Sequence, residues 1–434
     1  MVPILLNCLY LLLAIFYLPN LILKGKHRAG FKQRLGFYSQ KIKDKVKIQR
    51  PFVWIHAVSV GEIKAAQGII SSFKEKSPEK RILISTVTST GNALACQLAC
   101  ENDLVIYFPF DLTWIIKKTL KFFQPRLILI METELWPNLF IYAARKRIPV
   151  VIVNGRISDQ SFPLYRAAAF IFGLVLKNVA LFCMQTELDS QRIIHIGAQS
   201  DKVKVIGNLK FDAKEKNIRS DCKVIRFIKQ QEKSNFIVAG STHKKEEEIF
   251  VRVFTRLKLK YPHLCLLLAP RHPQRAEEIR SITKKYAQSV LISEIKKREI
   301  ILSPDKILIL DVMGILNKIY EFADIVLIGG SFVPFGGHNP IEAAVYGKPI
   351  IFGKYMFNFA QIAEIFLSHN ASICADSENE LYKHLDSLLC NAFKRQQLCK
   401  QAKDVVLKNK GAAQRLMRFL EHYRLLPADY AQTE

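Results

Sequence analysis

The sequence is poor in acidic residues compared with basic ones. It contains 38 Asp and Glu against 64 Lys and Arg, which leaves a formal net charge of +26 over 434 residues. Such an excess favours phosphate-bearing partners, namely nucleic acid, an anionic membrane face or a nucleotide-linked substrate. Half of the residues are hydrophobic, so a largely disordered chain is excluded, and the length corresponds to two or three domains.

Several short motifs are also absent from the sequence. The nine cysteines contain no CxxC pair, so neither a disulfide framework nor a zinc knuckle is indicated. Neither GxGxxG nor GxxxxGK[ST] occurs, which leaves a dinucleotide fingerprint and a P-loop without support. Zinc-finger spacing, an RNP-like aromatic motif and a heptad-bearing basic helix are missing as well, and this disfavours nucleic acid as the partner.

The N-terminus carries a membrane signal. No charged residue precedes Lys24, and residues 4–18 are almost entirely apolar, which predicts a membrane anchor over residues 1–24 that spans the bilayer or lies in its plane. Residues 24–50 contain ten Lys or Arg and one acid, Asp44. Positive flanks favour the cytoplasmic side and attract anionic headgroups, so we expect a cytoplasmic body. The alternative is a solvated basic face with no membrane role.

Beyond the basic stretch, short Val- and Ile-rich runs alternate with amphipathic stretches, as in parallel sheets covered by helices. The predicted strands are residues 52–58, 81–87, 104–108, 126–131, 150–154, 180–185 and 203–206, then 236–239, 264–269, 306–310, 325–328 and 349–352. A polar stretch between the two sets predicts a domain boundary. We therefore predict domains at 25–212 and 236–405, a linker at 213–235 and a C-terminal helix within 406–434, with an active site between the domains.

Three carboxylates and a lysine in the first half could carry chemistry. Glu62 follows strand 52–58 at the start of a helix, where it could accept a proton from a hydroxyl or merely complement the helix dipole. Glu132 and Glu134 follow strand 126–131 and share a face if the backbone stays extended. Such a pair suggests a metal site or a divided acid and base, or one of them caps the next helix. Lys210 could reach an anionic group or be solvated.

The second half shows clearer phosphate chemistry. Strand 264–269 ends at Pro270 and Arg271, which presents a guanidinium at the carboxyl end of a strand, and residues 240–243 end the preceding strand in the same way. A glycine-rich loop then opens a helix with Asn339 at the cap and Pro340 at the first position, so free backbone N–H groups face a phosphate. Glu342 fits both a capping box and hydrogen bonds to ribose hydroxyls.

Six motifs follow one another along nearly the full chain. They are QRLGFY at 33–38, HAVSVGE at 56–62, METELWPN at 131–138, GNLKFD at 207–212, RHP at 271–273 and GGHNPIE at 336–342. This series resembles the 3-deoxy-D-manno-octulosonic acid (Kdo) transferases of lipopolysaccharide synthesis. The resemblance implies an α/β fold of GT-B type, with two Rossmann-like domains facing across a cleft and an N-terminal membrane-anchoring helix.

The same resemblance implies an inverting glycosyltransferase that needs no metal or other cofactor. It would transfer Kdo from CMP-Kdo to the tetraacylated lipid A precursor at the cytoplasmic face of the inner membrane, in contact with membrane lipids. Glu62 looks like the general base, and Glu132 and Lys210 look like the residues that stabilise the transition state. The CMP moiety is expected at Pro270, Arg271, Val312, Met313, Gly314, Asn339, Pro340, Ile341 and Glu342.

One position departs from the family pattern, and two other functions stay open. Where the family usually has an acid after Met-Gly, this chain has Ile315. The first alternative is another GT-B enzyme that uses a UDP-sugar, a transferase or an epimerase, because fold alone does not determine the substrate. The second is a non-catalytic scaffold that binds acidic lipid at a membrane surface.

Overall fold

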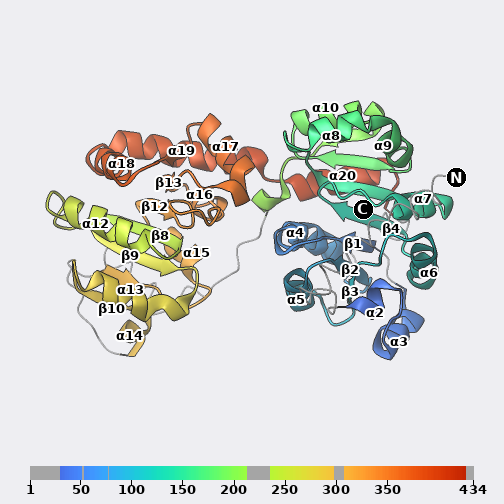
Figure 1. Cartoon of the computed structure of the whole chain (residues 1–434), viewed down its shortest axis with the longest axis horizontal. Coiled ribbons are helices and arrows are strands. Elements are labelled where there is room, and N and C mark those ends of the chain that lie inside the picture. The colour runs from blue at the N-terminus through green and yellow to red at the C-terminus, as the bar shows by residue number, and fades with distance from the viewer. Residues whose placement is uncertain (1–29, 51–52, 77, 213–234, 298–306, 427–434) are drawn as a thin grey trace. The chain divides into compact units, whose positions relative to one another are not determined.

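The computed structural model describes residues 30–50, 53–76, 78–212, 235–297 and 307–426 (Figure 1). The chain divides into two compact units, one formed by residues 1–214 with 409–434 and the other by residues 215–408. The predicted anchor at 1–24 and nearly all of the predicted linker at 213–235 lie outside the described residues. Each unit is a parallel sheet covered by helices, so the predicted α/β fold with two domains is confirmed.

The first sheet has seven parallel strands in the order β3-β2-β1-β4-β5-β6-β7. The strands are β1 (Val53–His56), β2 (Ile82–Thr86), β3 (Leu104–Tyr107), β4 (Leu127–Met131), β5 (Val150–Gly155), β6 (Leu181–Met184) and β7 (Val203–Val205). They match the seven predicted strands. The order reverses direction between β1 and β4, and open α/β sheets bind ligands beyond the carboxyl ends of the strands at such a point.

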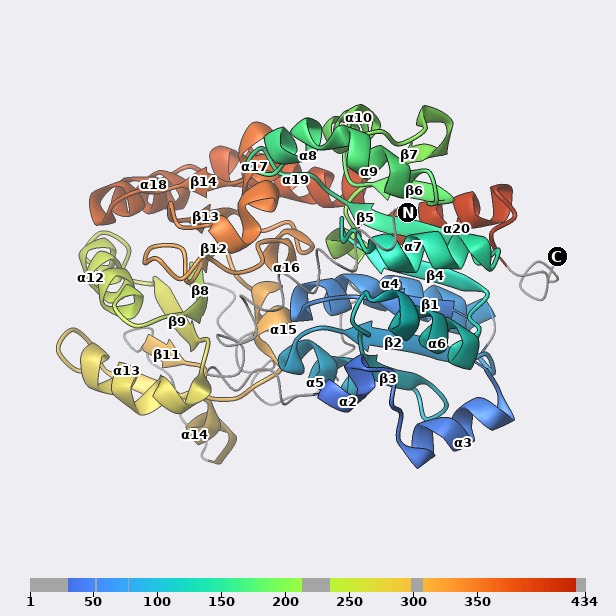
Figure 2. The same cartoon turned by 45° about the vertical axis from the view of Figure 1, so that its right-hand side comes forward.

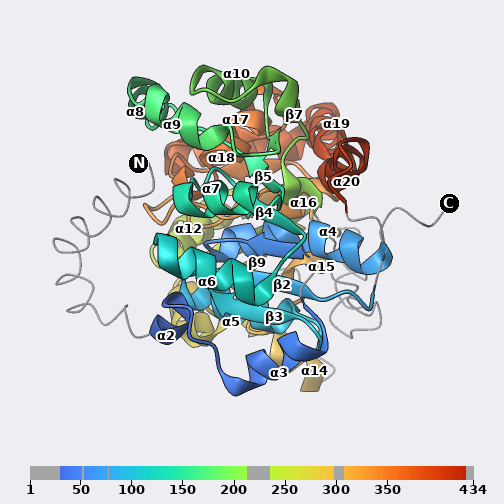
Figure 3. The same cartoon turned by 90° about the vertical axis from the view of Figure 1, so that its right-hand side faces the viewer.

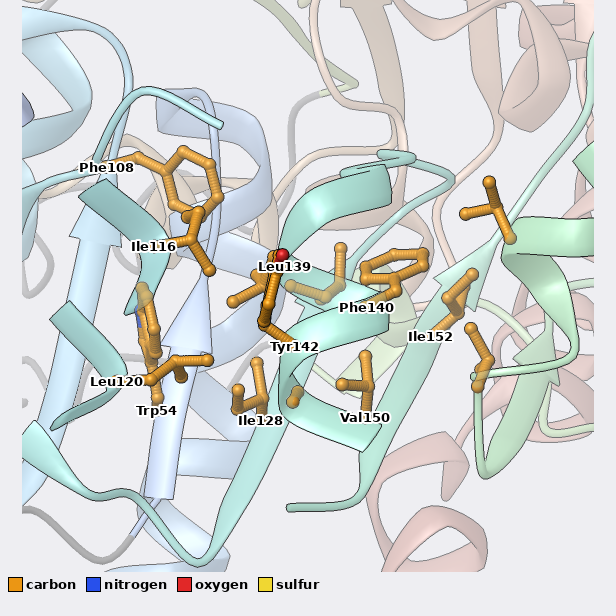
Figure 4. Packing of buried hydrophobic residues seen from close by; sticks show 14 of the residues in the cluster. Trp54, Phe108, Ile116, Leu120, Ile128, Leu139, Phe140, Tyr142, Val150 and Ile152 are labelled. Atoms are coloured by element: carbon orange, nitrogen blue, oxygen red, sulfur yellow. The ribbon is translucent and has the colours of Figure 1, made fainter. Parts of the chain in front are cut away.

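Both faces of this sheet are covered, which explains why its strands are continuous apolar runs. Val53 and Ile55 pack on one face, against helices α4 (Val60–Lys76) and α20 (Ala412–His422). Trp54 points to the other face and packs against α6 (Thr113–Phe123) and α7 (Pro137–Arg145). Figure 4 shows this second layer, in which side chains of α6 and α7 meet Trp54 and Ile128 of the sheet. The alternation of side chains along each strand therefore divides one hydrophobic sequence between two cores.

Helices connect the strands of the first unit. They are α2 (Phe31–Arg34), α3 (Gln40–Ile48), α4 (Val60–Lys76), α5 (Ser89–Leu98), α6 (Thr113–Phe123), α7 (Pro137–Arg145), α8 (Phe162–Ala167), α9 (Ala169–Leu176) and α10 (Glu187–His195), with 3-10 turns η1 (Ser200–Lys202) and η2 (Leu209–Asp212). Helices α6 and α7 lie side by side (Figure 3), and α8, α9 and α10 gather near β6 and β7 (Figure 2). Side-chain caps begin α5 at Thr88 and α10 at Thr186.

The C-terminal segment returns to the first unit. Helix α19 (Ala392–Asn409) ends beyond the boundary predicted at residue 406, and α20 (Ala412–His422) packs on α4. The carboxylate of Asp212 accepts hydrogen bonds from the backbone N–H groups of Gly411 and Ala413, both at 2.6 Å. Arg415 donates from Nε to the carbonyl of Ile206 at 2.7 Å. The segment from Ile206 to Asp212 is therefore anchored by α20.

The second sheet also has seven parallel strands, in the order β10-β11-β9-β8-β12-β13-β14. They are β8 (Phe236–Thr242), β9 (Cys265–Pro270), β10 (Ser289–Leu291), β11 (Ile307–Ile309), β12 (Ile325–Ile328), β13 (Ile350–Phe352) and β14 (Ile373–Cys374). All five predicted strands are present, and the sequence reading missed β10 and β14. These two are the edge strands, and the apolar stretches around them, 290–292 and 373–375, are shorter than the run at 307–310 that predicted β11.

The second unit has its own core and its own helices. Side chains of β8, β9, β11 and β12 pack against α12 and α18. The helical segments are α12 (Glu246–Lys258), η3 (Pro273–Arg275), α13 (Ala276–Thr283), α14 (Ile292–Lys297), α15 (Leu316–Tyr320), α16 (Ile341–Ala344), η4 (Phe357–Phe359), α17 (Ala360–Ser368) and α18 (Glu378–Cys390). Within the described residues of the whole chain, no helix combines the length and apolar character needed to cross a membrane.

Candidate functional site

Glu62 lies in the first turn of α4, directly after the carboxyl end of β1. Its Oε2 accepts a hydrogen bond from the backbone N–H of Val58 at 2.8 Å, and its Oε1 accepts one from the hydroxyl of Ser59 at 2.9 Å. The residue is 7% exposed. A carboxylate has about four lone-pair positions, so these two bonds leave acceptor capacity for a substrate hydroxyl. The loop holds the carboxylate in one orientation at the reversal point of the sheet.

The surroundings of Glu62 favour a carboxyl group that can exchange a proton near neutral pH. Burial raises the pKa of Glu62 from 4.5 to about 7, and the negative charges of Glu132 and Glu134 act in the same direction. The hydrogen bonds from Val58 and Ser59 oppose this shift because they stabilise the charged form. A pKa near the operating pH is the property that general base catalysis requires.

The backbone after β4 turns instead of staying extended. Glu132 has a φ of 56°, so the extended backbone on which the shared face of Glu132 and Glu134 depended is not present. The two carboxylates still interact, because burial first and the charge of Glu132 second raise the pKa of Glu134. Neither caps α7: the carboxylate of Asp111 accepts the N–H groups of Asn138 and Leu139, at 2.9 and 2.8 Å.

Lys210 is brought to Glu132 by the η2 turn. The distance between Lys210 Nζ and Glu132 Oε1 is 4.0 Å, and both side chains are partly exposed. Asn154, at the end of β5, accepts the N–H of Leu209 on its Oδ1 at 2.9 Å. Asn208 donates from Nδ2 to Gln185 at 2.9 Å and accepts the N–H of Lys210 at 3.0 Å. These buried amides hold the backbone of the turn that carries Lys210.

In the second unit, the residues predicted to contact CMP leave the sheet at one edge. Pro270 ends β9 and Arg271 follows it, residues 312–314 follow β11, and residues 339–342 follow the loop after β12. The strands β11, β9, β8 and β12 are neighbours in this order and run parallel, so their carboxyl ends meet. Arg271, Met313 and Gly314 are exposed there.

The helix expected after the glycine-rich loop starts one residue later than predicted. Helix α16 begins at Ile341, and Pro340 takes the cap position that the sequence assigned to Asn339. The side chain of Asn339 still accepts a backbone hydrogen bond, from the N–H of Ile341 at 3.1 Å. Asn side chains bond to the backbone two residues onward in such turns, which shifts the start of the helix by one residue.

The glycine-rich loop is held by the buried carboxylate of Glu246 in α12, a residue that was not predicted from the sequence. Glu246 is 0% exposed. Its Oε2 accepts the N–H groups of His243 and Gly330, at 2.9 and 2.7 Å, and its Oε1 accepts that of Phe332 at 2.8 Å. An acid in the first turn of an amphipathic helix gives no sequence signal that separates such a role from an exposed one. Among the described residues, no group of three or more His, Cys, Asp or Glu could hold a metal ion.

Comparisons with known proteins identify the family. The model described as 3-Deoxy-D-manno-octulosonic-acid transferase (kdotransferase) matches residues 29–213. The 3-deoxy-D-manno-octulosonic acid transferase of Haemophilus influenzae is 31% identical over 401 residues, which are 92% of this chain and 92% of that protein. The chain belongs to the Kdo transferase family. The 3-deoxy-D-manno-octulosonic acid transferase of Rickettsia typhi is 30% identical over 390 residues, which are 89% of this chain and 80% of the Rickettsia protein.

Other similar proteins carry less information about this Kdo transferase family member. A bifunctional glycosyltransferase/methyltransferase of Fusobacterium nucleatum is 34% identical over 369 residues, and the chain spans 56% of that protein. The solved structure of a UDP-GlcNAc 2-epimerase from Neisseria meningitidis matches with a TM-score of 0.57 at 14% identity, over 85% of this chain and 99% of that one. A glycosyltransferase from Rickettsia africae matches with a TM-score of 0.53 at 15% identity, over 89% of this chain and 100% of that one. At these identities the two structures show the fold alone.

The raised pKa of Glu62 predicts the acidic side of the pH profile of this Kdo transferase family member. If the carboxylate is the base, kcat/KM should be constant above neutrality and fall about tenfold per pH unit well below pH 7, because only the ionised form accepts a proton. Initial rates measured between pH 5 and 9 test this prediction. A kcat/KM that stays nearly constant down to pH 5, as the ordinary pKa of 4.5 for Glu would give, would show that burial does not tune the reacting group.

Proposed function

We propose that the protein transfers Kdo from CMP-Kdo to the tetraacylated lipid A precursor, with inversion at the anomeric carbon. The single observation that supports this reaction is the placement of a carboxylate with raised pKa, Glu62, at the reversal point of the first sheet, in a chain of the Kdo transferase family. The proposal includes the expectation that the two units act on the same donor and acceptor.

The proposed chemical step is one displacement. Glu62 takes the proton of an acceptor hydroxyl, whose oxygen forms a bond to the anomeric carbon of Kdo. The bond from that carbon to the phosphate oxygen breaks, and its electron pair leaves with CMP. Lys210, held beside Glu132, supplies positive charge where negative charge develops. The protonated Glu62 then returns its proton to solvent. We propose that these steps proceed without a metal ion or another cofactor.

For the donor we propose the carboxyl edge of the second sheet. Pro270 and Arg271, residues 312–314 and residues 339–342 leave neighbouring parallel strands there. A guanidinium is suited to a phosphodiester, because its planar fork matches two phosphate oxygens. Ile315 begins the segment that leads into α15 and has no carboxylate to offer. Contacts that relatives make through an acid at this position are therefore replaced or absent in this chain.

We also propose that the protein works at the cytoplasmic face of the inner membrane. This proposal is supported by the basic stretch at residues 24–50. The structure describes its helix α3, in which Lys41, Lys43 and Lys47 are exposed. Each Lys near an anionic leaflet contributes about 1 kcal/mol of attraction. The net charge of +26 also attracts the bisphosphorylated acceptor and the anionic donor.

The decisive experiment is incubation of the purified protein with CMP-Kdo and the lipid A precursor, followed by mass spectrometry of the lipid. We expect the precursor to gain the mass of one or more Kdo residues. CMP should also raise the melting temperature, by mass action on the folded state, and UDP should not. A protein stabilised by UDP alone would be a UDP-sugar enzyme, and an unmodified lipid with no nucleotide effect would point to a membrane-surface scaffold.

A further inference from the structure

Two imidazole rings form a hydrogen-bonded pair at the carboxyl edge of the second sheet. His243 follows β8 and His338 ends the glycine-rich loop after β12, and their Nε2 atoms are 2.9 Å apart. The ring planes differ by 8° and the ring centroids are 5.2 Å apart, so the rings meet edge to edge in nearly one plane. This geometry is that of an N–H···N hydrogen bond.

The pair lies at the reversal point of its sheet. Strands β8 and β12 are neighbours. From β8 the chain adds β9, β11 and β10 on one side, and from β12 it adds β13 and β14 on the other side, so the strand order reverses between them as it does between β1 and β4 in the first sheet. Ligands of open α/β sheets bind beyond the carboxyl ends of the strands at such a point. Arg271 follows β9, the other neighbour of β8, and its N–H donates to the carbonyl of Thr242 at 3.0 Å. The histidine pair thus shares the position of the residues expected to hold CMP.

The surrounding structure holds both rings in place. The ring of Phe335 stacks on that of His243 with centroids 4.3 Å apart. Gly330 has a φ of 69°, and a Cβ built on it would lie 3.3 Å from the Cδ2 atoms of both His243 and His338. A glycine is therefore required beneath the pair, since a side chain would press on both imidazoles. The carboxylate of Glu246 holds the backbone of His243 and Gly330 at once.

The hydrogen bond restricts how many protons the pair can carry. One imidazole must donate its Nε2–H, and the other must keep an Nε2 lone pair and place its proton on Nδ1. The second ring therefore stays neutral, and the pair as a whole carries either no charge or one positive charge. It can change its charge by one without breaking the bond.

Positive groups face His243 in the free protein. Burial lowers the pKa of His243, and the charges of His272, Arg275 and Arg271 lower it further. The carboxylate of Glu246, which accepts the N–H of His243, has its own pKa raised to about 7, chiefly by burial. Arg275 also pairs with the carboxylates of Glu247 and Glu278, at 2.8 and 3.0 Å. Burial and the facing cations therefore disfavour a proton on His243 when no anion is bound. A phosphate placed among these cations would offset their charge and raise the proton affinity of the pair.

We propose that the His243–His338 pair binds the phosphate of the donor nucleotide and takes up one proton when that phosphate binds. The inference rests on the proposed function, because it takes CMP as the occupant of the second unit. The positive charge then lies beside the phosphate at the moment when the broken bond adds a negative charge to it. The pair thereby stabilises the leaving group, in the way that fixed charges stabilise transition states in general.

Calorimetry of CMP binding at pH 7.5, in several phosphate-free buffers with different ionisation enthalpies, measures the proton uptake directly. We expect the wild-type protein to take up about half a proton or more per CMP. A bound phosphate among cations has a lower pKa itself, so CMP cannot be the group that gains this proton. The double variant His243→Gln/His338→Gln should bind CMP with nearly no uptake, because Gln forms hydrogen bonds and does not titrate. Each single variant keeps one imidazole and should show a smaller uptake than the wild type.

Two controls separate this effect from structural damage. His369→Gln changes an exposed histidine of the same unit and should leave the uptake at the wild-type value. Cytidine, which lacks the phosphate, should bind with no uptake. Melting temperatures report whether the double variant and the two single variants fold, and if the double variant does not fold, the single variants decide the question. Wild-type uptake in a folded double variant or in both folded single variants, or no uptake by the wild type, would overturn the inference.

The same titrations distinguish the inference from the proposed function. If UDP binds in place of CMP, with an uptake that the double variant loses, the donor assignment fails and the histidine pair stands. If CMP-Kdo is turned over and the uptake is unchanged in the variants, the function stands and the inference fails. Binding of neither nucleotide would overturn both.

Discussion

Replacing Glu62 with Gln is expected to lower kcat about 10³-fold and to leave CMP binding unchanged. A positioned general base contributes about 10² to 10⁴ in rate, and an amide cannot accept the proton. The Gln side chain has the same shape, and it can still accept the N–H of Val58 and donate to the hydroxyl of Ser59. Single-turnover rates with CMP-Kdo, beside calorimetry of CMP binding, provide the measurement.

Stability provides an independent check on this variant. An acid whose pKa is raised by folding stabilises the protein below its unfolded value and loses that contribution as the pH rises from about 4.5 through about 7. Above pH 7 the Gln variant should therefore be at least as stable as the wild type. Glu75→Gln, at an exposed position of the same helix, is the matched control and should keep full activity. A Glu62→Gln protein with kcat within a few-fold of the wild type would remove Glu62 from the mechanism.

Replacing Glu246 with Ala should destabilise the second unit by about 3 to 5 kcal/mol. The change leaves three N–H groups, those of His243, Gly330 and Phe332, without their acceptor. Each buried donor left unsatisfied costs about 1 to 3 kcal/mol, and the costs of neighbouring groups are not strictly additive. Because this carboxylate connects α12 to the glycine-rich loop, CMP affinity should fall together with stability.

Urea unfolding followed by far-ultraviolet circular dichroism, which reports the helices and strands of both units, measures this loss. The three tryptophans, Trp54, Trp114 and Trp136, belong to the first unit, so fluorescence reports that unit instead. Glu248→Ala is the matched control, because Glu248 is an exposed acid of the same helix that pairs with Arg252 at 3.3 Å. It should change stability by less than about 0.5 kcal/mol. Equal midpoints for the two alanine variants would contradict the role given to Glu246.

Much of the architecture could be predicted because its signals are local. Buried parallel strands are continuous runs such as 127–131, and each run is recognisable without knowledge of its neighbours. The edge strands β10 and β14 were missed, since the apolar stretches around them cover only 290–292 and 373–375 and are bounded by polar residues. For α20, the sequence predicted a C-terminal helix and did not predict that this helix packs on the first unit. Its position on α4 depends on contacts, such as those of Asp212, that join distant parts of the chain.

Within the site, the sequence was informative about which residues follow strands and uninformative about their environment. Glu62 and Arg271 could be placed at strand ends from the apolar run before each of them. The left-handed turn at Glu132 could not be foreseen, because an isolated Glu gives no signal for positive φ. The amides of Asn154 and Gln185, which determine the position of Lys210 through η2, also gave no signal, because their partners lie far along the chain.

The sequence by itself determined the two parallel α/β sheets, the strand ends that carry Glu62 and Arg271, and the motifs that the family shares. Periodicity and motif order are properties of residues close together in the sequence, so they can be recognised without the tertiary structure. Only the tertiary structure decided that Glu62 has a pKa near 7, that Lys210 lies beside Glu132, and that His243 meets His338. Burial, charge and hydrogen bonding act through space, and their partners come from separate strands.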